Sequence, residues 1–129
     1  MIANQPRTNA ILPFKSTADL SSKNGYAVVI DPANPGQVVV QSNAASVTFG
    51  VITMGDVTSG ANSVAITYGG VAGTVLVKLA SAAVVGDLLS SDATGAFDTT
   101  SDVISAMAVE AGSTGDLVEA VLVTPYDRS

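Results

Sequence analysis

The chain contains no cysteine, no histidine and no tryptophan. Without cysteine and histidine it has no thiol nucleophile, no imidazole base, no disulfide and none of the usual zinc ligands. Carbohydrate sites commonly use aromatic platforms, and this sequence offers only three tyrosines and three phenylalanines for that purpose. These absences exclude most familiar catalytic machinery and leave the chain poorly equipped to bind sugars.

Positive charge is also scarce. The 129 residues include five lysines and arginines against eleven aspartates and glutamates, which gives a net charge of −6. Such a surface repels phosphate backbones, so we expect no direct contact with nucleic acid. Arg7, Lys15 and Lys23 lie near the N-terminus beside a single acid, Asp19. The sequence therefore predicts a basic N-terminal segment on an acidic body.

Long hydrophobic runs are missing as well. No apolar run reaches the roughly 18 residues that a membrane helix needs, because the longest candidate, residues 71–86, is interrupted by Lys78. The apolar stretch at residues 10–14 is too short for a signal sequence and is followed at once by Lys15. We therefore expect a soluble protein that has no membrane partner and is not exported.

The abundant residues are those of β-structure. Valine, isoleucine and threonine are frequent, glycine occurs twelve times, and no long segment has helical periodicity. A hydrophobic content of 47% is enough for one core without metals or disulfides. The predicted fold is mainly β, a small β-barrel or β-sandwich-like domain with little helix; the alanine-rich stretch at residues 80–84 allows one helical turn.

Local patterns predict individual strands and turns. Two β-branched runs flank Pro35 and Gly36, which suit the second and third positions of a turn, so we expect a hairpin. Residues 47–51 and 64–68 each place large apolar side chains at every second position, with Val47, Phe49 and Val51 expected on one face. In residues 74–79 the odd positions are apolar and the even positions are mixed. The last hairpin joins two apolar runs across residues 105–123.

Residues 1–24 follow neither periodicity and are rich in Asn, Ser, Thr and Pro. The interpretation is an extended basic and apolar N-terminal arm at residues 1–24, followed by a β-rich domain at residues 25–129. The arm still carries Ile11, Leu12 and Phe14. Large apolar residues in such a segment usually dock on the chain's own domain, on a neighbouring subunit or on a foreign surface.

Each run of the last hairpin contains one glutamate, Glu110 in the first and Glu119 in the second. In a chain without histidine, a pair of carboxylates is the one acid/base design that remains. The alternative, which we favour, is that each glutamate faces solvent or a subunit boundary, or discourages edge-to-edge aggregation. No catalytic residue is predicted.

Two further motifs have weak functional interpretations. Asp92, Asp98 and Asp102 surround Gly95 and could offer oxygen ligands to calcium, but their spacing does not match an EF-hand loop. A solvated turn region is the favoured interpretation. The glycines of residues 69–73 are not followed by Lys-Ser/Thr and predict a hairpin turn instead of a phosphate-binding loop. We therefore expect no metal and no cofactor.

Several short phrases occur in a characteristic order. A Gly-Val strand at residues 49–54 is followed by Gly-Asp-x-Leu at 86–89 and Asp-x-x-Gly at 92–95. The chain closes with Ala-x-Glu-Ala-x-x-x-Gly-Asp at 108–116 and an apolar strand at 117–123. This order resembles that of the capsid cement, or head decoration, proteins of tailed bacteriophages.

The resemblance covers residues 46–123 and is strongest over 75–123. It implies a mainly β structural protein without enzyme activity that is made in the host cytoplasm and becomes part of the virion. It further implies a homotrimer on the outer surface of an expanded capsid, at three-fold or quasi-three-fold positions. There the protein would bind the major capsid protein and stabilise the shell.

The residues proposed for contact with the capsid or a neighbouring subunit lie in both parts of the chain. They are Arg7, Ile11, Leu12, Phe14 and Lys15 in the arm, and Lys78, Glu110 and Glu119 in the domain. An alternative function is another structural β-module, such as a fibre or adhesin domain that binds a protein. A carboxylate hydrolase is a third and weaker alternative.

Overall fold

The computed structural model describes residues 11–16, 20, 22–54, 63–68 and 74–127. Within these ranges the chain forms strands, turns and bends and contains no helix. The strands are β1 (Ile11–Lys15), β2 (Ala27–Ile30), β3 (Val38–Val40), β4 (Gly50–Met54), β5 (Ser63–Tyr68), β6 (Val75–Lys78), β7 (Leu88–Ser91), β8 (Phe97–Asp98), β9 (Val103–Ala108) and β10 (Leu117–Asp127). The prediction of a mainly β fold is confirmed.

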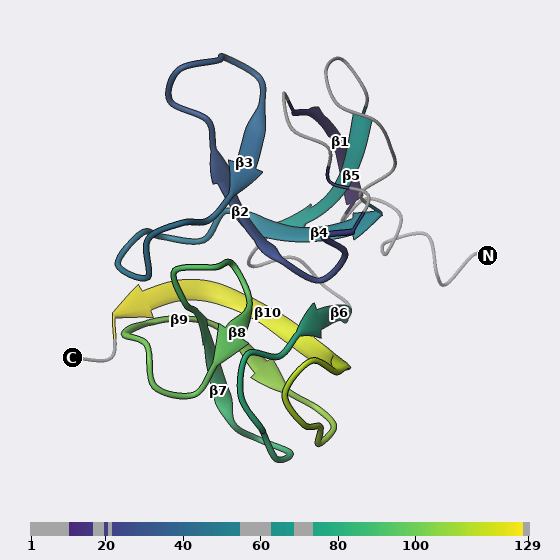
Figure 1. Cartoon of the computed structure of the whole chain (residues 1–129), viewed down its shortest axis with the longest axis vertical. Helices are drawn as coiled ribbons and strands as arrows, with labels where there is room; N and C mark the ends of the chain where they lie inside the picture. Colours follow the sequence, from purple (N-terminus) through teal and green to yellow (C-terminus); the bar gives the residue numbers. More distant parts are fainter. Residues whose placement is uncertain (1–10, 17–19, 21, 55–62, 69–73, 128–129) are drawn as a thin grey trace.

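The strands form two antiparallel sheets, one from each half of the chain (Figure 1). Sheet A has the order β1-β5-β4-β2-β3, and sheet B has the order β6-β10-β9-β7-β8. An isolated parallel bridge between Leu79 and Phe97 brings the two edges of sheet B together at one point. Because neither sheet is closed into a continuous ladder, the sandwich-like form of the predicted fold describes this chain better than a barrel.

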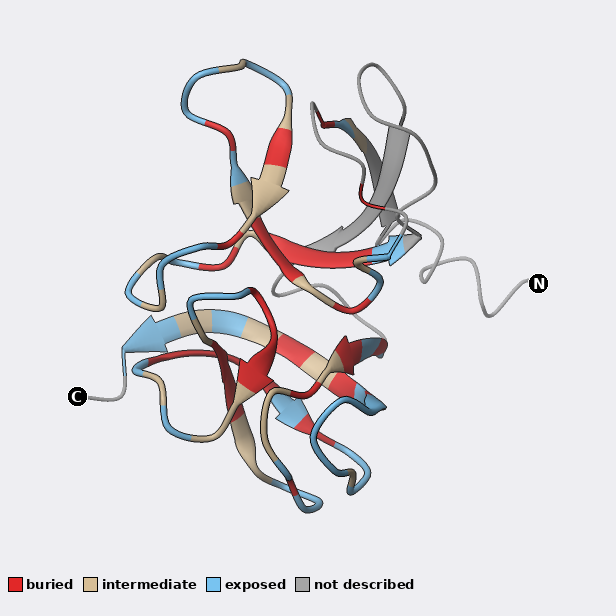
Figure 2. Cartoon of the chain, viewed as in Figure 1, coloured by how far each residue is buried: buried red, intermediate tan, exposed pale blue. Residues whose placement is uncertain are grey.

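The main core lies on the inner side of sheet B and against sheet A. Val75, Val77 and Leu79 are buried while the residues between them are not, as the alternation in residues 74–79 predicts. They join one apolar cluster that includes Phe97 from β8 and Val51 from β4. Figure 2 shows the buried stretches on the strands of both sheets. Burial of this cluster therefore holds the two sheets together.

A second, smaller cluster lies within sheet A. It is built around Leu20, Val28, Val38 and Ile52. Phe14 packs against this cluster and meets Phe49 edge to face, with 5.3 Å between ring centroids. Part of the predicted arm therefore adds to the domain: β1 pairs with β5, and the Leu20 side chain is buried. The domain boundary at residue 24 stays a prediction.

The hairpin predicted at Pro35 and Gly36 is confirmed. Strands β2 and β3 pair antiparallel, the Gln37 amide donates to the Asn34 carbonyl at 3.1 Å, and Gly36 has φ of 79°. A positive φ at the third turn position is what glycine supplies without steric cost. Asp31 supports the same loop, since its carboxylate accepts hydrogen bonds from the Asn34 side chain and the Ala33 amide.

These hydrogen bonds predict a pH-dependent contribution from Asp31. The bond from Asn34, and then the bond from the Ala33 amide, lower the pKa of Asp31 below its ordinary value of 3.8. A lowered pKa in the folded state stabilises the protein above the ordinary pKa, and this gain disappears as the pH falls through the lowered value. We expect the stability difference between wild type and Asp31→Asn in urea to shrink below about pH 3.8. An equal difference at pH 3 and pH 7 would contradict this.

The prediction that Val47, Phe49 and Val51 share a face is wrong. Strand β4 begins only at Gly50, Val47 is 65% exposed, and Phe49 and Val51 belong to different clusters. The cause is Gln41, whose buried side chain donates to the Asn43 and Ser46 carbonyls and accepts from the Thr48 hydroxyl. These bonds hold the segment before β4 as a loop.

The alanine-rich stretch at residues 80–84 forms no helical turn. The backbone of Ala83 instead exchanges two hydrogen bonds with Gly112, each of 3.0 Å. Gly112 also packs closely against β10, since a Cβ atom there would lie 2.4 Å from Val118 Cγ1. The glycine turn predicted at residues 69–73 lies outside the described residues.

Candidate interaction surface

The structure places the predicted contact residues of the arm in different situations. Arg7 and the side chains of Ile11 and Leu12 lie outside the described residues. Phe14 is half-buried against the chain's own Phe49, so the first of the three docking alternatives holds for this residue. Lys15 is exposed at the end of β1.

Glu110 and Glu119 lie close to each other, and each carboxylate accepts a hydrogen bond from a neighbouring part of the chain. The Glu110 carboxylate accepts a hydrogen bond of 2.8 Å from the backbone amide of Glu119. The Glu119 carboxylate accepts one of 2.7 Å from the hydroxyl of Thr74. Both side chains are exposed, so neither lies in the water-excluded surroundings in which an enzyme's acid and base usually work. The arrangement supports the structural interpretation of the two glutamates.

The bond from the Glu119 amide to Glu110 predicts a small stability effect. Glu110→Ala should lower the free energy of unfolding by about 1 kcal/mol, because it removes the carboxylate that accepts a hydrogen bond from the Glu119 amide. Glu110→Gln keeps a side-chain oxygen and should lose less. Urea denaturation of both variants checks this. Equal losses for alanine and glutamine would show that the hydrogen bond to the amide contributes nothing.

The strand register assembles a continuous surface from the outward side chains of sheet B. Lys78 lies opposite Leu117, Leu76 lies opposite Glu119, and Met107 lies between Val121 and Leu88. The Val109 amide donates to the Glu119 carbonyl, which places Val109 beside Glu119. We call this surface the outer face of sheet B, and it comprises Leu76, Lys78, Leu88, Met107, Val109, Leu117, Glu119 and Val121.

The outer face of sheet B is unusually apolar for a surface. Leu76 is 53% exposed, Leu117 43% and Met107 40%. Single exposed apolar residues need no explanation, but a contiguous group marks a surface that meets another molecule. Sequence reasoning selected only the charged members, Lys78 and Glu119. The available signal was that residues 117–123 carry apolar side chains at both even and odd positions.

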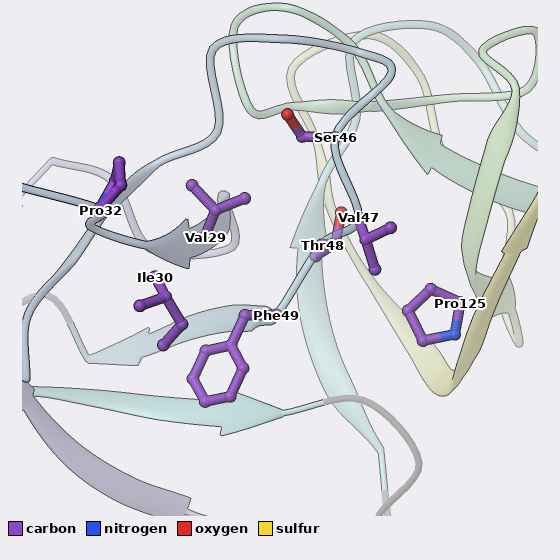
Figure 3. Close-up of a pocket in the computed structure, with 8 residues that line it drawn as sticks. All are labelled: Val29, Ile30, Pro32, Ser46, Val47, Thr48, Phe49 and Pro125. Atoms are coloured by element: carbon purple, nitrogen blue, oxygen red, sulfur yellow. The ribbon is translucent and has the colours of Figure 1, made fainter.

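An open groove of about 640 Å³ lies between sheet A and the C-terminal part of β10 (Figure 3). Its lining is apolar except for two hydroxyl residues: Val29, Ile30, Pro32, Ser46, Val47, Thr48, Phe49 and Pro125. Pro125 comes from β10, so the groove brings the last strand of sheet B beside the loop that precedes β4. With no ionisable side chain in its lining, the groove offers contact area and no acid or base.

The aspartates around Gly95 serve the local turns. Asp92 accepts hydrogen bonds from the amide and hydroxyl of Thr94, and Asp98 accepts three from residues 100–101. Among the described residues, no group of three or more acidic side chains is arranged to hold a metal ion. These contacts support the interpretation of this region as turns shaped by aspartate and glycine.

Comparison with known proteins gives no family assignment. No family model matches the chain, and no curated protein does. The likeness to capsid cement proteins therefore rests on the sequence phrases alone and stays a prediction. In the described ranges, no helix is long and apolar enough to cross a membrane.

Proposed function

We propose that this chain is a structural virion protein that binds the outside of an expanded phage capsid and stabilises it as a cement, or decoration, protein. The observation that carries the proposal is the outer face of sheet B, where exposed apolar side chains surround the carboxylate of Glu119, which accepts a hydrogen bond from Thr74. A surface of this kind suits contact with another protein. The resemblance in the sequence supplies the identity of that protein, the major capsid protein.

The proposed mechanism is purely one of added contact. A protein that bridges neighbouring capsomers contributes binding free energy at each joint, and a standard interface buries roughly 1,600 Å². Repetition over a shell multiplies a modest gain at each site. We propose a homotrimer, because three equivalent contacts match a local three-fold axis and a closed ring covers strand edges.

Shell stability tests the proposal. Expanded shells assembled without this protein should release their genome, or rupture, at a lower temperature than the same shells incubated with it. Sedimentation equilibrium of the protein alone should give three times the chain mass if it is a trimer before binding. Shells that bind the protein and rupture at an unchanged temperature would exclude the cement role.

A second candidate is a fibre or adhesin module, which the apolar groove beside Pro125 favours. An open groove of this chemistry fits an extended apolar peptide better than a broad capsid surface. This function predicts no saturable binding to shells. Loss of partner binding in Ile30→Ser, a change within the groove, would support it, since Ile30 is 47% exposed.

A further inference from the structure

We infer that the outer face of sheet B is the capsid-facing surface, and that it docks on an apolar patch of coat protein that brings a lysine or arginine to Glu119. This inference rests on the proposed function and names the chemistry of the partner surface. It is carried by the position of Glu119 among apolar side chains and by the charge of the chain.

Glu119 lies in the middle of the apolar surface. Its strand neighbours on the two sides are Leu76 of β6 and Val109, which follows β9. The Thr74 hydroxyl holds one carboxylate oxygen, Oε2, at 2.7 Å. Within the described part of the chain, the other oxygen accepts no hydrogen bond and no cation pairs with either oxygen. The carboxylate is therefore oriented by one hydrogen bond and keeps an oxygen open to a partner.

An occupant of this face has to satisfy that carboxylate. Covering Leu76, Val109 and Met107 removes water from around Glu119, and a carboxylate that loses its water is strongly destabilised unless it is paired. A lysine or arginine that arrives with the partner would make the missing charge-assisted hydrogen bond. Leu76 and Leu117 also line a hollow of about 130 Å³ with Asn24 and Gly25, which offers space for an apolar side chain of the partner.

The charge of the chain distinguishes a foreign cationic surface from a second copy. A second copy placed on this face would bring its own Glu119 and the nearby Glu110, with Lys78 as the one cation of the face. The chain as a whole carries −6, so two such faces repel each other. A coat-protein surface with cations instead gains from attraction both at a distance and in contact.

The test measures binding to expanded shells assembled without this protein, for five forms of the full-length chain. Two changes lie on the face, Glu119→Lys and Met107→Gln. Two controls lie elsewhere on exposed positions: Asp102→Lys, with the same change in charge, and Val84→Gln, with a similar change in polarity. Thermal unfolding of every variant comes first, and all should unfold near the wild-type temperature because the altered side chains are exposed.

We expect Glu119→Lys and Met107→Gln to bind at least ten-fold more weakly than wild type, with both controls unchanged. Wild-type affinity in Glu119→Lys would overturn the inference, and the cement function would survive it. Failure of wild type itself to bind would contradict the proposed function. If Glu119→Lys changed the mass of the protein in solution while Asp102→Lys did not, the face would be a contact between copies, which also overturns the inference.

Discussion

Replacing Gly95 with alanine should lower the free energy of unfolding by about 3 kcal/mol. Gly95 has φ of 90°, and a Cβ atom there would lie 2.6 Å from Val40 Cγ1 and 3.2 Å from Tyr26 Cδ2. Its carbonyl also accepts a 2.8 Å hydrogen bond from the Ala27 amide, which joins the turn of sheet B to β2 of sheet A. The added methyl group would therefore press on the contact between the two sheets.

Gly115→Ala is the matched control for this change. Gly115 also has φ of 90°, but a Cβ atom there meets nothing within 4 Å. The decrease in the free energy of unfolding of Gly115→Ala measures the backbone strain alone and should be about 1 kcal/mol. Urea denaturation of the two variants separates strain from crowding. Equal decreases in the free energy of unfolding for the two variants would show that contact with Val40 and Tyr26 does not add to the cost at Gly95.

Replacing Phe97 with alanine should cost about 3–5 kcal/mol, the usual range for a large buried aromatic residue. Phe97 has no exposed surface and belongs to the main cluster that contains residues of both sheets. Its carbonyl also accepts the 2.6 Å hydrogen bond from Ala80 at the point where the edges of sheet B meet. Loss of the ring would leave a cavity next to this contact.

Phe97→Leu should recover much of the loss because it refills part of the cavity with apolar volume. Val85→Ala provides a control outside the core, since Val85 is 66% exposed and should change stability by less than about 0.5 kcal/mol. Thermal and urea unfolding of the three variants compare these effects. A loss below about 1 kcal/mol in Phe97→Ala would mean that the ring does not support the core.

Short-range patterns predicted the strands and turns that depend only on neighbouring residues. The turn at Pro35 and Gly36 follows from the φ preferences of its two central residues, and the buried positions of β6 follow from period-two alternation. The Asp-x-x-Gly turn at residues 92–95 forms for a similar local reason, with the Gly95 amide donating to the Asp92 carbonyl.

Features that depend on distant contacts were not predictable in this way. The loop before β4 is shaped by the side chain of Gln41, and no sequence period shows that a glutamine will be buried with both its amide nitrogen and its oxygen hydrogen-bonded. The pairing of β1 with β5 joins residues that are about fifty positions apart. Neither helical nor strand periodicity in residues 1–24 pointed to it.

The candidate surface shows the same division. The sequence singled out Glu110, Glu119 and Lys78 by their charge, and the structure places all three on or beside the outer face of sheet B. The apolar residues around them were unremarkable one by one. They form a continuous surface only because the pairing register of β6, β10, β9 and β7 places them side by side. That register cannot be deduced from the sequence.

The position of β1 and Leu20 changes how the N-terminal arm is best tested. Deleting the first 23 residues would remove β1 from the edge of sheet A and Leu20 from the second cluster. Such a protein would lose stability whatever the arm binds. A chain that begins at Ile11 keeps both features and removes Arg7, so it tests more cleanly whether the basic segment contacts the capsid as proposed.

The most direct test of the account is co-sedimentation of the full chain, and of the chain that begins at Ile11, with expanded shells that lack this protein. The account predicts saturable binding of the full chain at a fixed ratio to coat subunits. Weaker binding of the shorter chain would add the N-terminal segment to the capsid contact that we propose for sheet B. Absence of saturable binding by the full, folded chain would contradict the proposal that this chain is a capsid cement protein.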